Sequence, residues 1–179
     1  MKLLQKISYR IDCLSRYAAY LAIGLVLACA LVSVGNALSR YLFDISSNAW
    51  LELQWYMFAG IVMLGAAHLL CTNGHIRIDL IYLRLSTRQR IYLDLFGLLF
   101  FVLPFCIVMV VDGWPWFMEA WAIEERSANA GGLIRWPVKL FIPIGFGLLI
   151  LQTISECIKR VLALQGNASL NDSYQRPQQ

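Results

Sequence analysis

The sequence predicts an all-α integral membrane protein with four transmembrane helices, on three observations. The 179-residue chain is 59% hydrophobic and only 15% charged, with a mean hydropathy of +0.61, whereas a soluble domain has about 25% charged residues. Its apolar residues fall into four long runs, each close to the ~20 residues that a helix needs to cross a bilayer. Runs such as LFGLLFFVLPFCIVMVV do not alternate between apolar and polar residues, which argues against the strands of a membrane β-barrel.

We expect a four-helix membrane domain over residues 1–164 and a polar, disordered cytoplasmic tail over 165–179. The expected helices run over about 17–38, 49–71, 92–115 and 136–157. The first of them resembles a secretory signal peptide, but its apolar run is longer than the ~7–15 residues of a signal core. We therefore expect an uncleaved first helix.

The distribution of lysine and arginine predicts the orientation of the helices. The first 16 residues, the segment 72–90 and the chain from residue 158 onward hold eleven of them. The other side holds four, namely Arg40, Arg126, Arg135 and Lys139. Because positive residues collect on the cytoplasmic side, both termini and segment 72–90 are expected in the cytoplasm. The net charge of +4 then reflects membrane topology and not nucleic-acid binding.

The segment between the second and third helices, CTNGHIRIDLIYLRLSTRQR, is expected to contain a short interfacial amphipathic helix. Arg77, Arg84 and Arg88 share one helical face by their spacings of seven and four. The stretch IRIDLIYLRL also alternates as a strand does, so periodicity alone does not decide. A lone strand at a membrane surface would leave its backbone unpaired, which favours the helix.

The residues needed for common catalytic and cofactor chemistry do not occur in recognisable arrangements. The five cysteines form no CxxC pair, and no GxxxxGK[ST] loop is present. His68 and His75 belong to the same end of one helix, whereas haem ligands in a bundle come from facing helices. The sequence therefore predicts no enzyme activity, no cofactor and no metal site.

Small residues on two of the expected helices indicate close helix packing. Gly24 and Ala28 are four apart in the first helix, and Gly60, Gly65 and their neighbours make the second rich in small side chains. Such positions let helix backbones approach closely in lipid. The packing partner is either another helix of this chain or a second protein, and the sequence leaves both open.

Glu52, in NAWLELQWYMFAG, is the most conspicuous ionisable residue of the expected helices, beside Asp94 and Asp112. A charged residue inside a membrane is costly and indicates function. A lone glutamate near tryptophans is typical of small proton-coupled exporters, which also have four helices. However, Glu52 lies only about one turn inside, it follows the N-capping run SSN, and Arg40 lies at a matching depth to pair with it. The favoured interpretation is a capped, ion-paired structural acid.

Four short motifs, in order, resemble the small permease subunit of TRAP transporters (tripartite ATP-independent periplasmic transporters, DctQ-like). They are RYLF at 40–43, WLEL at 50–53, GAAHLL at 65–70 and GHIRIDL at 74–80. The resemblance covers about residues 10–160. The chain departs from the common pattern at Leu51, where a second acid is usual, and at ERSANAGGLIRWPVK, where a Pro-x-Trp stretch is usual. These departures leave the substrate undefined.

The resemblance implies a scaffold subunit of a bacterial inner-membrane, Na⁺-coupled transporter that imports organic acids. Its implied partners are a large permease of about twelve helices, which carries the substrate and Na⁺ sites, a periplasmic substrate-binding protein, and membrane lipid. With four helices and no deep charge, the chain is poorly equipped to carry an anionic solute alone. The rival interpretation is a stand-alone proton-coupled small-molecule exporter that uses Glu52.

The motifs carry over to three groups of residues. Intersubunit or structural contacts near the periplasmic face are expected from Arg40, Trp50 and Glu52. The turn that fixes the second helix against the interfacial helix is expected to use His75, Arg77 and Asp79. Docking of the periplasmic binding protein, or simply a solvated loop, is expected at Glu124, Glu125 and Arg126.

Overall fold

The computed structural model describes residues 2–45, 47–74 and 85–166, and every regular element in these ranges is a helix. In chain order they are α1 (Lys2–Phe43), α2 (Asn48–Cys71), α4 (Thr87–Gly97), the π-helical turn η1 (Leu98–Val102), α5 (Leu103–Ala122) and α6 (Trp136–Leu164). Because α4, η1 and α5 follow one another without a break, they form a single span, and the described residues contain four helices long and apolar enough to cross a membrane. The predicted fold class is confirmed.

The first, third and fourth helices extend beyond the bounds expected from the apolar runs, to Lys2–Phe43, Thr87–Ala122 and Trp136–Leu164. α1 begins at Lys2 instead of residue 17, and its 42 residues make it about 63 Å long, roughly twice the ~30 Å of bilayer hydrocarbon. The third span begins at Thr87, where Ser86 and Gln89 form a capping box. The expected interfacial helix falls mostly in 75–84 and lies outside the described residues.

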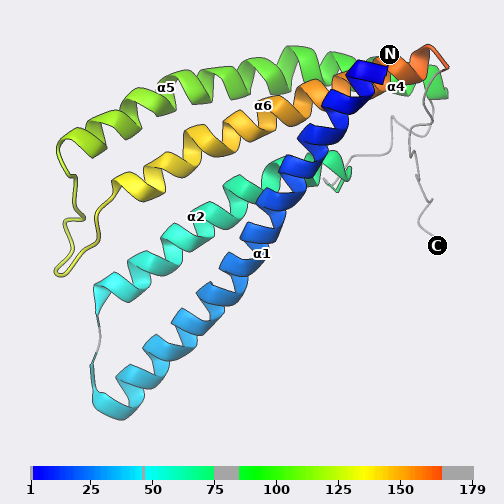
Figure 1. Cartoon of the computed structure of the whole chain (residues 1–179). Coiled ribbons are helices and arrows are strands. Elements are labelled where there is room, and N and C mark those ends of the chain that lie inside the picture. The colour runs from blue at the N-terminus through cyan, green and yellow to red at the C-terminus, as the bar shows by residue number, and fades with distance from the viewer. Residues whose placement is uncertain (1, 46, 75–84, 167–179) are drawn as a thin grey trace.

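The four spans form two antiparallel hairpins (Figure 1). α1 and α2 lie side by side and are joined through residues 44–47, and α5 and α6 lie side by side and are joined through 123–135. The hairpins meet where the start of α1 crosses the end of α6, and they fan out toward the two connections. We call the end of the molecule where α1 crosses α6 the terminal end. The opposite end, which holds the connections 44–47 and 123–135, is the loop end. α6 is the central helix, because it packs against α1, α2, α4 and α5.

Small residues allow α6 and α2 to approach one another closely. A Cβ added to Gly145 of α6 would lie 2.6 Å from the Cβ of Met63, and one added to Gly60 of α2 would lie 2.8 Å from a methyl group of Leu25. Gly24 and Gly65, in contrast, have no such neighbour within 4 Å. Gly60 therefore packs against another helix of this chain. The sequence had left open whether such small residues pack within the chain or against a second protein.

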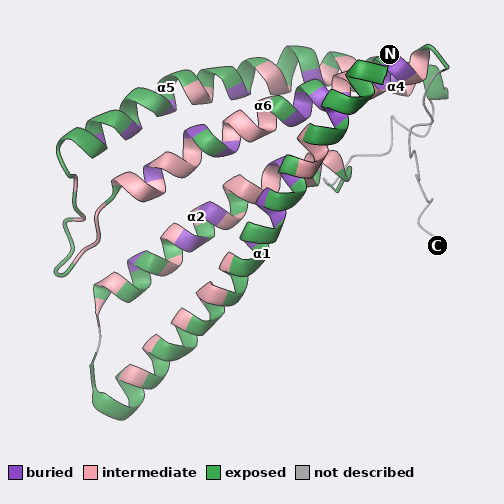
Figure 2. Ribbon diagram, viewed as in Figure 1, coloured by how far each residue is buried: buried purple, intermediate pink, exposed green. Residues whose placement is uncertain are grey.

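Exposed residues cover the outer faces of all four spans (Figure 2), and many of them are large apolar residues. Between 11% and 33% of the most apolar window of each span is buried inside the chain. A water-soluble protein rarely exposes apolar area on this scale, so lipid or another membrane protein must cover the rest. Buried residues concentrate instead on the faces where the helices meet, and several of them are polar or charged.

Candidate functional site: two buried polar clusters

The connection between α5 and α6 folds into a tight hairpin. The Ser127 N–H donates to the Leu133 carbonyl at 3.0 Å, and Arg126 and Ile134 form an isolated antiparallel bridge. The Gly132 N–H closes the turn by donating to the Asn129 carbonyl at 2.9 Å. Gly131, the third residue of this turn, has a φ of 72°, a conformation that glycine adopts without steric cost. The sequence NAGG thus fixes the shape of the loop.

Glu52 of α2 binds this hairpin through three hydrogen bonds. Its Oε1 accepts from the Ser127 hydroxyl and, at 2.7 Å, from the Asn129 side-chain amide. Its Oε2 accepts the Leu133 backbone N–H at 2.8 Å. Glu52 is only 3% exposed, so its carboxylate is removed from water and solvated by the loop instead. We call Glu52, Ser127, Asn129 and Leu133 the Glu52 cluster.

The start of α2 is built so that Glu52 faces the loop. The Ser47 hydroxyl caps the helix by accepting the Ala49 N–H at 3.3 Å. Asn48, four residues before Glu52 and hence on the same face, donates its side-chain amide to the Ala130 carbonyl at 3.3 Å. Asn48 and Glu52, on one face of α2, therefore both bind the connection between α5 and α6.

The expected pair between Arg40 and Glu52 is not formed. Arg40 is exposed on the last turn of α1 and makes no hydrogen bond or ion pair with Glu52 in the described part of the chain. The donors that bind the Glu52 carboxylate are the Ser127 hydroxyl, the Asn129 amide and the Leu133 N–H of the loop. Trp50 is exposed two residues before Glu52 and takes no part in the cluster. Matching depth alone was therefore an insufficient guide to the partner of Glu52.

Of the three residues expected to dock a partner, Glu125 is engaged within the chain. Its carboxylate pairs with Lys139 in the first turn of α6 and with Arg135 at 3.4 Å. The hydrogen bond from Lys139 holds the pKa of Glu125 below its usual value. The Lys139 ammonium also lies 4.2 Å from the centre of the Trp116 ring, a cation–π arrangement. Glu124 and Arg126 remain exposed on the loop.

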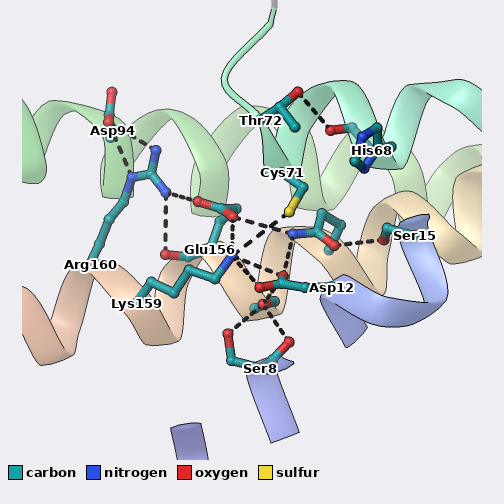
Figure 3. A network of polar contacts seen from close by, with 12 residues as sticks. Ser8, Asp12, Ser15, His68, Cys71, Thr72, Asp94, Glu156, Lys159 and Arg160 are labelled. Carbon is teal, nitrogen blue, oxygen red and sulfur yellow. Dashed lines mark hydrogen bonds and ion pairs between the residues drawn. The ribbon is translucent and has the colours of Figure 1, made fainter. Parts of the chain in front are cut away.

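A second and larger cluster lies at the terminal end (Figure 3). It joins one face of α6 to α1 and α4, and we call it the Glu156 cluster after its central residue. Its members are Ser8, Asp12, Ser15, Asp94, Gln152, Ser155, Glu156, Lys159 and Arg160. The two members of α6 nearest its middle, Gln152 and Ser155, are 0% exposed.

The charged members alternate in sign. Arg160 donates to Glu156 at 2.5 Å and to Asp94 of α4 at 3.1 Å. Lys159 donates to Glu156 and to Asp12 of α1, both at 2.8 Å. The three carboxylates therefore share two cations, which leaves a formal charge of −1 (three acids minus two bases) within the cluster.

Neutral donors complete the hydrogen bonding of the cluster. The Gln152 amide donates to Asp12 at 3.0 Å and to Glu156 at 3.2 Å. Its carbonyl oxygen accepts the Ser15 hydroxyl at 2.6 Å, and Ser155 donates to Asp12 at 3.0 Å. A buried charge is tolerated when it is paired and fully hydrogen-bonded, and this arrangement meets that condition.

The oxygen and sulfur atoms of Asp12, Cys71 and Glu156 lie close enough together to hold a metal ion. However, the Lys159 ammonium already donates to both carboxylates and lies 4.0 Å from the Cys71 sulfur. A cation at this point would have to displace Lys159. The arrangement is therefore suited to joining α1, α2, α4 and α6, and not to metal chemistry.

The Glu156 cluster was missed from the sequence, which predicted no deep charge. One signal was readable: Gln152 lies four residues before Glu156, and Lys159 and Arg160 lie three and four residues after it, which places all of them on one side of a helix. Asp12 carried no such signal, because its partners are more than 130 residues away in the chain. Only the crossing of α1 and α6 brings them together.

His75, Arg77 and Asp79 lie outside the described residues. The preceding end of α2 is described: Thr72 donates its hydroxyl to the His68 carbonyl at 3.0 Å. The expected role of the three residues stays a prediction.

Comparison with known proteins gives a family over most of the chain. No curated protein matches it. The family model described as "Tripartite ATP-independent periplasmic transporters, DctQ component" matches residues 29–163. These include α2, α4, α5, all of α6 but its last residue, the whole Glu52 cluster, and the Glu156 cluster except its α1 members Ser8, Asp12 and Ser15. The chain therefore belongs to the DctQ family, the small permease component of the TRAP transporters.

Proposed function

We propose that this protein is the scaffold subunit of a Na⁺-coupled TRAP transporter that imports organic acids. It lies in a bacterial inner membrane with both termini in the cytoplasm. In this function it anchors and supports the large permease, which carries the substrate and Na⁺ sites, and a periplasmic binding protein delivers the solute. The family of the chain and its four apolar spans support this proposal.

The observation that carries the scaffold role is that polar clusters join the two hairpins at both ends. At the loop end Glu52 of α2 holds the α5–α6 connection, and at the terminal end Glu156 of α6 is linked to Asp12 of α1 through Lys159. Buried polar networks that are fully satisfied favour one arrangement of the helices. Such a body is suited to staying fixed while a partner moves.

The same geometry disfavours the proton-coupled exporter. A transporting carboxylate must alternately bind and release its cargo, and its oxygens must be reachable. Both oxygens of Glu52 accept hydrogen bonds from a loop of the same chain. Releasing them would require the loop hairpin to open, which would also leave the Leu133 N–H without its partner.

Reconstitution tests the proposal. Proteoliposomes that contain the large permease, with the binding protein and an organic acid outside, should take up the acid along an inward Na⁺ gradient only when this chain is present. Replacing Na⁺ by choline should abolish uptake. Transport of a small molecule by this chain alone, driven by a proton gradient and lost in Glu52→Gln, would instead establish the exporter.

A further inference from the structure

The acidic residues of α5 differ from those of the other spans in having no partner. The acids of α1, α2, α4 and α6 are all bound within the Glu52 and Glu156 clusters. Asp112 and Glu119 of α5 are exposed, and their side chains form no hydrogen bond or ion pair with any residue that the structure describes. Their carboxylates therefore face the surroundings of the chain.

Asp112 lies deep in the membrane-spanning part of the molecule. A Cβ added to its neighbour Gly113 would lie 3.7 Å from the ring of Pro143 in α6, and one added to Gly145 would lie 2.6 Å from the Cβ of Met63 in α2. Met63 is 15 residues after the first residue of α2 and 8 before the last, about 22 Å and 12 Å from its ends. Because α2 is only slightly longer than the ~30 Å of hydrocarbon, Asp112 lies well inside that layer.

The surroundings of Asp112 on α5 add an acceptor and no donor. Pro115, inside the helix, has no N–H to donate to the carbonyl of Val111, one turn earlier. Val111 and Pro115 are both exposed. A carboxylate beside such a position is costly in hydrocarbon, and acids inside membranes are accordingly found paired or facing other protein.

The carboxylate belongs to an otherwise largely apolar helix face, which we call the Asp112 face. Its members follow spacings of three and four and are all exposed: Phe105, Val108, Asp112, Pro115 and Glu119. Only its edge touches α6, where the rings of Phe105 and Phe146 have centroids 5.6 Å apart. Spacings of three and four form the seam along which two helices pack at about 20°.

We propose that the Asp112 face is the docking surface for a membrane helix of the large permease that carries a lysine or arginine at the level of Asp112. This inference rests on the proposed function, which supplies the permease as the partner. The basic side chain pairs with the carboxylate away from water, and Phe105, Val108 and Pro115 pack against the same helix. Such a charge pair fixes the register of the two helices.

Neither lipid nor a second copy of the chain satisfies Asp112. Acyl chains offer no donor, and the aspartate side chain is too short to reach the headgroups as a lysine does. A second copy docked through the same face would bring two Asp112 carboxylates together, and like charges oppose that arrangement. A helix with a positive charge is the partner that this face suits.

Binding of the purified large permease to the full-length chain in detergent tests the charge pair. Asp112→Asn keeps the shape of the side chain and should raise the Kd about tenfold or more, because the basic residue of the permease then loses its buried partner. Asp44→Asn is the matched control, since Asp44 is exposed in the α1–α2 connection and asparagine adopts its positive φ readily. This control should bind as the wild type does.

Charge reversal identifies the partner of Asp112. Asp112→Lys should abolish binding, because it places two cations together inside the membrane. Each lysine and arginine in the membrane helices of the large permease is then changed to aspartate in turn. One of these exchanges should restore binding to Asp112→Lys, which a change in the partner could not do if the variant were merely misfolded.

Photocross-linking tests the face independently of charge. Val108 and Ile107 are 54% and 45% exposed and lie at the same depth, but adjacent positions point about 100° apart around a helix. With p-benzoylphenylalanine in place of Val108, the chain should cross-link to the large permease several-fold more than with the same residue in place of Ile107.

Four results would overturn this inference, and they separate it from the proposed function. If wild type and Asp112→Asn bind the large permease equally, or if no exchange restores Asp112→Lys, the charge pair is wrong while the scaffold role stands. Equal cross-linking from Val108 and Ile107 would place the interface on another face. Cross-links between two copies of the chain would identify a second copy as the occupant. If the wild-type chain does not bind the permease at all, the proposed function fails together with this inference.

Discussion

The Glu52 carboxylate accepts the backbone N–H of Leu133 at 2.8 Å, across 81 positions of the sequence. This contact joins the first hairpin to the connection of the second at the end where the hairpins fan apart. Without the Glu52 carboxylate, which also accepts from Ser127 and Asn129, the loop would be held to α2 chiefly by the weaker contact from Asn48 to Ala130 at 3.3 Å. The Glu52 cluster is therefore the structural link of the loop end.

Glu52→Gln should lower the thermal unfolding temperature of the detergent-solubilised protein by several degrees. The substitution keeps the shape of the side chain but replaces one acceptor oxygen by a donor, which then faces another donor of the loop. Glu124→Gln is the control, because Glu124 is exposed on the same loop. Equal unfolding temperatures for the two variants would contradict the role of Glu52.

Gly132→Ala should destabilise the loop, by about 1–3 kcal/mol as for other overpacked positions. An added Cβ would lie 2.5 Å from the Cβ of Ser127, which donates to Glu52. Gly35→Ala is the matched control, because a Cβ there has no neighbour within 4 Å in α1. Chemical denaturation of both variants measures the difference. A Gly132→Ala protein as stable as Gly35→Ala would show that the hairpin shape is not needed.

Arg160→Met should lower the free energy of unfolding by about 3–5 kcal/mol, because it leaves the buried Glu156 with Lys159 as its remaining cation and takes from the half-buried Asp94 the cation that pairs with it. The comparison variant is Arg16→Met, which removes an exposed arginine of α1. Adding Glu156→Gln to Arg160→Met should recover part of the loss, since it removes the buried carboxylate that lost Arg160 as a partner. If the double variant is as unstable as the sum of the two single variants, the pair is not coupled.

Stability should depend on pH through Glu125. Its pKa is lowered from the usual 4.5, chiefly by the hydrogen bond from Lys139, so the folded state favours the charged carboxylate. The resulting stability is complete above the pKa of the unfolded chain and is lost as the pH falls through the lower pKa of the folded protein. The difference in unfolding temperature between wild type and Glu125→Gln should therefore shrink as the pH falls from about 7 to about 3. If the difference in unfolding temperature between wild type and Glu125→Gln stays constant over this pH range, the ion pair between Glu125 and Lys139 is not its source.

The sequence alone was sufficient for the fold class, because apolar runs of bilayer length can only be satisfied as helices in lipid. It was also sufficient to single out Glu52, since a carboxylate in such a run is rare.

Tertiary structure alone decided the partners of the charges. Arg40 and Glu52 are near in sequence and matched in depth, yet Glu52 binds Ser127, Asn129 and Leu133 instead. Asp12 lies in a stretch that the apolar pattern left outside the first helix, and it meets Lys159 only because α1 extends to Lys2 and crosses α6. Hydrophobic length is a local property that each segment carries by itself. A hydrogen bond between distant residues depends on how the helices cross, and that crossing is set by the packing of the whole chain.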